Sequence, residues 1–177
     1  MKRDGARTQI AARGFTLTEL LMVSGLGLVL MTIILGATNI SSQVLVALHG
    51  QGVVQMQLNT AMSLLSQDGR IATTATSTAT SLTLTVPSID VNGAPLIGMS
   101  DTFTYDFNAA TGILQRTVNP GGGVRENLVQ VVAHGITQVT FDTSSPRAVT
   151  ITLSARQMES GYAFDGVLST QVAFRNI

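Results

Sequence analysis

The strongest constraint on this chain is a long stretch without charge: between Glu19 and Asp68 there is no Asp, Glu, Lys or Arg. Within it, residues 20–37 are apolar or glycine, and only Ser24 and Thr32 interrupt the run with hydroxyl groups. A run of this length reaches the lower limit for a helix that crosses a bilayer, and hydroxyl groups do not prevent insertion. The sequence therefore predicts a membrane-spanning helix over about residues 17–37.

The formal net charge of zero hides an uneven distribution. Residues 1–14 carry four basic residues and one acid, and the next basic residue is Arg70. Because basic residues stay on the cytoplasmic side of a spanning helix, we expect the N-terminus in the cytoplasm and the remainder outside it. The rest of the chain is net acidic, so no nucleic-acid binding through a basic patch is predicted. The chain contains no cysteine, which excludes disulfides and cysteine-based zinc sites.

The helical pattern continues beyond the apolar run. Apolar side chains recur every three or four residues, with one gap, which is the period of an amphipathic helix: Ile40, Val44, Leu48, Val54, Leu58, Met62 and Leu65. A helix over residues 15–67 would be about 80 Å long, more than twice the thickness of a bilayer. We expect residues 54–65 to pack on the protein's own head and the uncovered part to suit helices of other subunits. Gly25, Gly27 and Gly36 either allow close helix approach or are simply tolerated in lipid.

The remainder of the chain predicts a β-rich head. Residues 68–80 form a junction rich in Ser, Thr and Ala, and residues 81–177 alternate between apolar and polar side chains with the period of a strand. Gly, Asn, Asp and Pro separate the alternating segments, as in tight turns. The expected fold is α+β: a long N-terminal helix packed on one half-buried antiparallel sheet. The predicted strands are residues 82–86, 103–107, 113–118, 128–131, 136–141, 149–153 and 167–174.

Glu19 is the candidate functional residue of the helix. A lone carboxylate in a membrane helix costs about 2.5 to 3.5 kcal/mol at the bilayer centre, and less near an end, so it marks a function by default. Residues Thr16 to Glu19 also fit a capping box, in which the acid serves only its own helix. Both interpretations are open on the residues alone.

A basic leader, Gly14, Phe15, Glu19 four positions later and an uncharged helix occur here in succession. This combination resembles the class III signal of the type IV pilin and pseudopilin superfamily, over residues 1 to about 40. The strand succession of the head is similar to minor pilins and minor pseudopilins of the W and J kind. The chain departs from many pilins in having no proline before Pro87 and no disulfide in the head.

The resemblance implies specific roles and partners. A prepilin peptidase would cleave after Gly14 and methylate the new amine of Phe15, and Glu19 would pair with that amine on a neighbouring subunit. Other pilin or pseudopilin subunits would contact the N-terminal helix in the filament, the lipid bilayer would surround this helix before assembly, and an inner-membrane assembly platform would add the subunit to the filament. The protein would then be a structural subunit without enzymatic activity or cofactor, anchored once in a bacterial inner membrane before assembly into a pilus or pseudopilus.

Other motifs carry little weight. Asp90, Asn92 and Asp101 have part of the spacing of a calcium loop, but Ala94 and Pro95 stand where a ligand and a glycine are needed, so a turn is predicted. Residues 121–123 lack the lysine of a phosphate loop and predict a hairpin loop. His49 and His134 have no metal-ligand spacing, and no nucleophile lies in a recognisable elbow.

One alternative function belongs to a different class. The first 37 residues could be an ordinary signal or anchor, with a poor cleavage candidate at residues 35–37, on a secreted or anchored β-sheet binding protein. Glu19 and the amphipathic continuation of the helix argue against this alternative.

Overall fold

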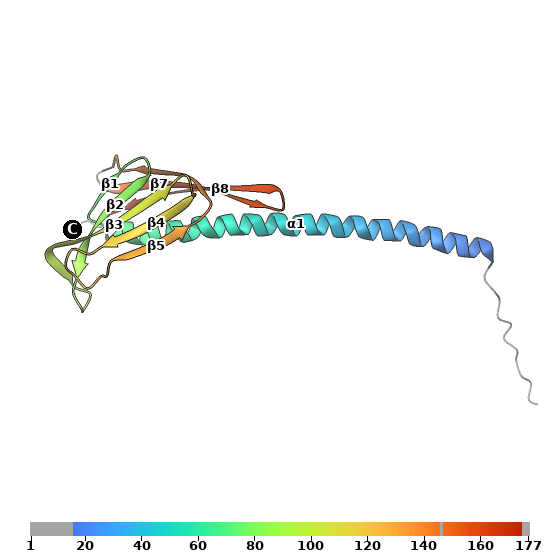
Figure 1. The fold of residues 1–177 in the computed structure, drawn as a ribbon, viewed down its shortest axis with the longest axis horizontal. Coiled ribbons are helices and arrows are strands. Elements are labelled where there is room, and N and C mark those ends of the chain that lie inside the picture. The colour runs from blue at the N-terminus through green and yellow to red at the C-terminus, as the bar shows by residue number, and fades with distance from the viewer. Residues whose placement is uncertain (1–15, 146, 175–177) are drawn as a thin grey trace, which may run out of the picture. The chain divides into compact units, whose positions relative to one another are not determined.

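The computed structural model describes residues 16–145 and 147–174. It contains one helix, α1 (Leu17–Ile71), and eight antiparallel strands, which confirms the predicted α+β class (Figure 1). The chain divides into two compact units, Met1–Val44 and Leu45–Ile177. The strands are β1 (Thr74–Ser77), β2 (Ser81–Ile89), β3 (Pro95–Asn108), β4 (Ile113–Asn119), β5 (Leu128–Ala133), β6 (Ile136–Asp142), β7 (Ala148–Glu159) and β8 (Tyr162–Ala173).

The part of α1 in the first unit is a continuous helix that includes Gly25, Gly27 and Gly36. Its hydroxyl side chains donate to backbone carbonyls three or four residues earlier; Ser24 bonds to the Leu20 oxygen at 2.8 Å and Thr32 to the Val29 oxygen at 2.8 Å. Such bonds satisfy the hydroxyls inside the helix. The first half of α1 can therefore lie in an apolar medium without an unpaired hydroxyl at these positions.

The part of α1 in the second unit packs on the strands, as predicted for residues 54–65. Val54, Leu58, Met62 and Leu65 are buried, whereas the earlier members of the periodic pattern are exposed. Complete burial of a leucine side chain contributes roughly 1.5 to 3 kcal/mol, so Leu58 and Leu65 are major contacts between helix and head.

The strands form two sheets instead of the single sheet expected. Strands β1 to β5 make one meander and β6 to β8 another. The chain leaves the first sheet at Gly135, whose φ of 67° suits glycine. The Gly135 oxygen accepts a bond from Arg156 N, and Ile136 N donates to the Gly112 oxygen. Strand β6 consequently pairs with β7 and not with β5.

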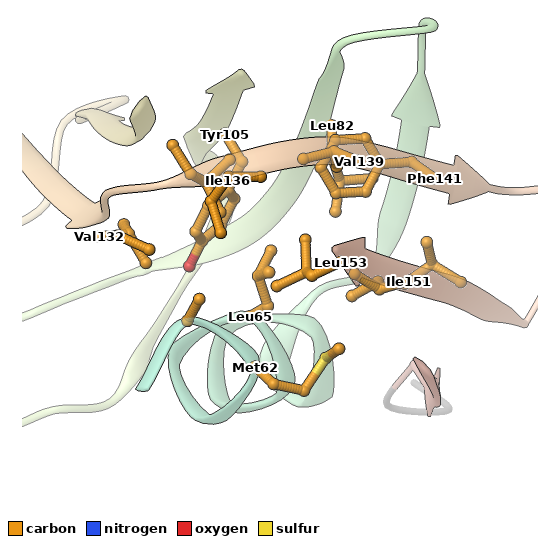
Figure 2. Close-up of a cluster of buried hydrophobic side chains, with 14 of the residues drawn as sticks. Met62, Leu65, Leu82, Tyr105, Val132, Ile136, Val139, Phe141, Ile151 and Leu153 are labelled. Carbon is orange, nitrogen blue, oxygen red and sulfur yellow. The ribbon is translucent and has the colours of Figure 1, made fainter. Parts of the chain in front are cut away.

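One core joins α1 to both sheets (Figure 2). Met62 and Leu65 of the helix lie among Leu82 and Tyr105 of the first sheet and a row of side chains from the second. Alternation along each strand points every second side chain inward, as in β2, where alternate residues are buried. The residues contributed by β6 and β7 to this core include Ile136, Val139, Phe141, Ile151 and Leu153.

Three segments differ from the sequence-based boundaries. Strand β3 was predicted over residues 103–107 but begins at Pro95 and ends at Asn108. The junction over residues 68–80 contains β1, which pairs with β2 from Thr74 to Ser77, so a polar Ser/Thr/Ala composition did not exclude a strand. Strands β7 and β8 extend into a longer hairpin than expected. The hairpin turns at Ser160 and Gly161, which both have positive φ, as the two central residues of a type I′ turn require.

A pair of glycines on α1 offers a matched test of how tightly the β7–β8 hairpin packs on the helix. A Cβ on Gly50 would lie 2.3 Å from Phe164 Cδ2, whereas one on Gly52 would meet nothing within 4 Å. We expect Gly52→Ala to stabilise the protein by about 0.5–1 kcal/mol through helix propensity. Gly50→Ala should destabilise it by about 1–3 kcal/mol through overpacking. Urea unfolding of the full chain in detergent would measure both, and equal effects would contradict the close packing.

Candidate functional site

The processing residues predicted from the sequence, Gly14 and Phe15, lie outside the described residues. Glu19 is described, and it forms a capping box with Thr16. Thr16 N donates to Glu19 Oε2 at 2.9 Å, and Glu19 N donates to Thr16 Oγ1 at 3.3 Å. The local role of Glu19 is therefore realised within one chain, while its pairing with a second subunit stays a prediction.

The surface of α1 that follows Glu19 is apolar and uncovered. Its large aliphatic side chains are more than half exposed, and its most apolar window of 18 residues has a mean hydropathy of 2.4. By length and composition this helix could cross a membrane. Exposed apolar area of this extent marks a surface for lipid or for other protein. The side chains include Leu20, Leu21, Met22, Val23, Leu26, Leu28, Val29, Leu30, Met31, Ile33, Ile34 and Leu35.

The other end of α1 is tied to the first sheet by a buried charged group, which we call the Asp68 cluster (Asp68, Tyr105 and Arg116). Arg116 of β4 donates to both carboxylate oxygens of Asp68, from Nε at 2.6 Å and from an Nη at 3.1 Å. The Tyr105 hydroxyl of β3 donates to the same carboxylate at 2.6 Å. The side chains of Asp68 and Arg116 are only 5% and 12% exposed. A bidentate, buried ion pair of this kind fixes the position of the helix relative to the sheet.

A second buried carboxylate, Asp101 of β3, organises the loop between β4 and β5. We call this group the Asp101 cluster: Asp101, Ser88, Gly121 and Arg125. The Ser88 hydroxyl, the Gly121 backbone amide and the Arg125 guanidinium all donate to the carboxylate. Arg125 also donates to the Pro87 oxygen at 2.8 Å. The loop is held in place because its donors converge on one fully buried acid.

The two clusters change the acidity of their members in ways that follow from burial and pairing. Burial alone would raise the pKa of Asp101, but the donors from Ser88, Gly121 and Arg125 outweigh it and hold that pKa below its usual value. Burial, followed by the negative charge of Asp68 and the bond to it, raises the pKa of Tyr105. Burial would lower the pKa of Arg116, but the bond to Asp68 outweighs it and raises that pKa. Asp101 and Arg116 therefore stay ionised at neutral pH.

Phe103 lies between the two clusters. The Arg116 guanidinium carbon is 4.5 Å from its ring centroid and that of Arg125 is 5.4 Å away, both within cation–π range. Phe103 and the two arginines line a pocket of about 300 Å³ together with Val118 and residues 126–128. Each arginine is bound to a buried carboxylate, Arg116 to Asp68 and Arg125 to Asp101, so the two ion pairs fix helix, sheet and loop.

Sequence reasoning missed both clusters, although the strand alternation contained a signal. Asp101, Phe103 and Tyr105 occupy successive inward positions of β3, and Arg116 lies between the inward positions of Leu114 and Val118 on β4. A charged residue at an inward position requires a buried partner. The pattern could therefore have marked Asp101 and Arg116 as paired residues without identifying their partners.

Two of the weaker motifs form a turn and a loop, as the sequence predicted. The Asp90 carboxylate accepts bonds from the amides of Asn92 and Ala94 at 2.8 Å each, which makes a turn. Residues 121–123 form the loop after β4. His49 Nε2 lies 3.9 Å from Glu159, and His134 is exposed. Within residues 16–145 and 147–174, no three His, Cys, Asp or Glu side chains gather as metal ligands would.

Neither comparison with known proteins identifies a relative: no family model matches the chain, and no curated protein matches it.

Proposed function

We propose that this chain is a pilin-like structural subunit. A prepilin peptidase releases it at Phe15, and its N-terminal helix packs among those of other subunits in a type IV pilus or a type II secretion pseudopilus. It acts there as a minor component. Before assembly it spans a bacterial inner membrane once, with the head on the extracytoplasmic side.

The observation that carries the proposal is that the two halves of α1 differ in exposure: the first half is exposed and the second half packs on the head. Residues 20–44 present an uncharged and exposed surface in the described chain. In the second half, one face of the helix is buried under the head and Asp68 joins it to β4. A plain membrane anchor needs only the first half. A helix that must carry a head at a fixed position in a helical assembly needs both halves.

Glu19 gives this assembly a register. When a subunit leaves the bilayer for a filament, a carboxylate without a partner among apolar helices remains costly, and the free amine created at Phe15 has the opposite charge. Pairing of Glu19 with that amine on a neighbour would remove the cost at one axial offset only. Gly25, Gly27 and Gly36, around which a Cβ would meet nothing within 4 Å, leave room for a neighbouring helix to approach.

The N-terminus of the mature protein tests the proposal. We expect mass spectrometry of the protein from cells with a prepilin peptidase to find N-methyl-Phe15 as the first residue, and Gly14→Val to keep the leader. Cleavage near Ala37 would support the alternative, a signal-bearing β-sheet binding protein. An intact Met1 in the wild-type protein would contradict the proposed processing.

A second experiment separates assembly from capping. Glu19→Ala should still be inserted and cleaved, but its incorporation into sheared filaments should fall at least about tenfold, equivalent to 1.4 kcal/mol. Thr16→Ala is the matched control, because it removes the hydroxyl of the capping box and keeps the carboxylate. Equal defects in the two variants would assign Glu19 to capping alone, and normal incorporation of Glu19→Ala would refute the pairing.

A further inference from the structure

The turn between β2 and β3 contains the only asparagine of the chain that is followed by a glycine, Asn92 before Gly93. Such a pair is chemically unstable, because the backbone nitrogen of the glycine can attack the asparagine side-chain carbon and no Cβ hinders its approach. In a folded protein the reaction depends on exposure, on the bonds that hold the two groups and on the freedom of the backbone.

The tip of this turn is exposed and unpacked. Asn92 and Gly93 are exposed, and so are Val91, Ala94 and Pro95 on either side. A Cβ on Gly93 would meet nothing within 4 Å. Backbone of this kind opens locally at little cost in free energy. The two reacting groups can therefore leave the conformation of the closed turn without disturbing the core.

Within the turn, the Asn92 side chain is held more loosely than the backbone. The Asp90 carboxylate accepts the backbone amides of Asn92 and Ala94 at 2.8 Å each, and the Gly93 amide donates to the Asp90 backbone oxygen at 3.0 Å. In contrast, Asn92 Nδ2 lies 3.5 Å from Asp90 Oδ2, at the limit of a hydrogen bond, and Asn92 Oδ1 accepts no bond from the described residues. The side-chain amide is therefore open to attack once the bond from Gly93 N breaks.

The other asparagines are less reactive, because each precedes a residue that carries a side chain. They are Asn39, Asn59, Asn108, Asn119, Asn127 and Asn176. The Asn108 side-chain oxygen accepts two backbone amides, at 3.0 and 3.3 Å. Asn119 precedes Pro120, whose nitrogen has no proton to lose. Asn39 and Asn59 lie within α1, where the helix fixes the backbone.

We propose that Asn92 is a site of spontaneous modification, at which the chain converts to aspartate and isoaspartate by reaction with water and without an enzyme. The Gly93 nitrogen loses its proton to solvent base and forms a bond to Asn92 Cγ, and the side-chain amide takes up a proton and leaves as ammonia. Water then opens the resulting cyclic imide at either carbonyl. Release of the nitrogen from Cγ gives aspartate, and its release from the main-chain carbonyl carbon gives isoaspartate, whose backbone runs through Cγ.

Either product changes the turn. It places a carboxylate where the Asn92 amide now lies 3.5 Å from the Asp90 carboxylate, and two like charges at this distance repel each other. Isoaspartate also lengthens the backbone by a carbon atom, so the amides of Gly93 and Ala94 no longer both reach Asp90. The conversion therefore adds one negative charge to the exposed end of the β2–β3 hairpin and loosens it.

Peptide mapping by mass spectrometry tests the site, after incubation of the full chain in detergent at neutral and at alkaline pH. We expect acid to accumulate at Asn92 faster than at any other asparagine. The rate should rise at alkaline pH, because the Gly93 nitrogen must lose its proton. Labelling with an isoaspartate methyltransferase distinguishes isoaspartate from aspartate. Faster conversion of another asparagine, or no conversion of Asn92 at alkaline pH, would overturn the proposal.

Two glycines of the hairpin provide a matched pair of variants. Gly93 and Gly98 have similar positive φ, 82° and 79°, and a Cβ at either would meet nothing within 4 Å. Gly93→Ala adds a Cβ to the attacking residue, and we expect the rate at Asn92 to fall at least about tenfold, equivalent to 1.4 kcal/mol in the barrier. Gly98→Ala imposes the same backbone strain in the hairpin and should leave the rate unchanged. Equal rates in the two variants would refute attack by the Gly93 nitrogen.

Asn92→Asp reproduces one of the products and tests its effect on the turn. We expect the backbone amides of Gly93 and Ala94 to exchange hydrogen about fivefold faster than in the wild-type chain, because repulsion between the two carboxylates opens the turn. Unchanged exchange of these amides would contradict the loosening of the hairpin.

Discussion

Asp68→Ala is expected to lower the free energy of unfolding by about 3–5 kcal/mol, because it leaves a buried guanidinium and a buried hydroxyl without their shared acceptor. Asp68 accepts three bonds, from Arg116 and from Tyr105, and its side chain is only 5% exposed. The loss should exceed that of any single exposed ion pair in the head. It should also loosen the end of α1 from the sheet.

Urea unfolding of the full chain in detergent, followed by tyrosine fluorescence, would measure the effect. The chain has no tryptophan, and Tyr105 lies in the core beside Asp68. Gln67→Ala, at an exposed neighbouring position, is the control and should have little effect. A loss for Asp68→Ala no larger than that for Gln67→Ala would show that the ion pair does not hold the helix.

The same cluster allows a sharper test of the cause. Replacement of a whole buried polar group by apolar residues of similar size is often neutral, whereas removal of one partner is costly. We expect the triple variant Asp68→Leu, Arg116→Leu, Tyr105→Phe to recover most of the stability that Asp68→Ala loses, as measured by urea unfolding followed by circular dichroism, because this variant lacks Tyr105. Failure to recover it would indicate that volume or backbone geometry, and not unpaired charge, causes the loss.

Asp101→Ala should have an effect of similar size, about 3–5 kcal/mol, because it leaves Arg125 without its buried partner. The carboxylate is fully buried and also accepts the Gly121 amide at 2.8 Å, so the loop between β4 and β5 should become more mobile. Hydrogen exchange of the Gly121 amide would report the loop, and urea unfolding would report the stability. Asp106→Ala, an exposed acid on the same strand, is the control.

Asp101 also predicts how stability depends on pH. Its pKa in the folded protein lies below its unfolded value near 3.8, so folding favours the ionised form. Its contribution is complete above that unfolded value and is lost as the pH falls through the folded pKa. We expect the wild-type head to lose stability below about pH 4, and Asp101→Ala to lose less over the same range. Parallel pH profiles for the two proteins would contradict this assignment.

Much of the fold could be predicted from local pattern. The helix, its change of character after the apolar run, and seven of the strands follow from periodicities that a short window reveals. Strand β1 and the long β7–β8 hairpin were missed. Strand β1 was missed because the sequence around Thr74 is polar and does not alternate with apolar residues. The length of the hairpin was missed because its turn consists of only two residues, Ser160 and Gly161.

The residues of the candidate site also differ in how far the sequence could predict them. Gly14, Phe15 and Glu19 are candidates because a motif of a few neighbouring residues marks them, and of their predicted roles the described chain contains the capping box of Glu19 with Thr16. The Asp68 cluster could not be predicted, since Tyr105 and Arg116 are 37 and 48 positions away from Asp68 along the chain. Alternation indicates that such residues point inward, but only the register of β3 with β4 brings Tyr105 opposite Arg116.

The sequence by itself determined the apolar helix, the lone carboxylate at its start and the alternating strands, because helix and strand formation depend on residues that are close along the chain. The tertiary structure alone decided that the strands form two sheets, that Asp68 ties the helix to one of them and that β5 lies at the edge of its sheet. Each of these outcomes depends on which distant segments pair, and burial of one shared core selects that pairing.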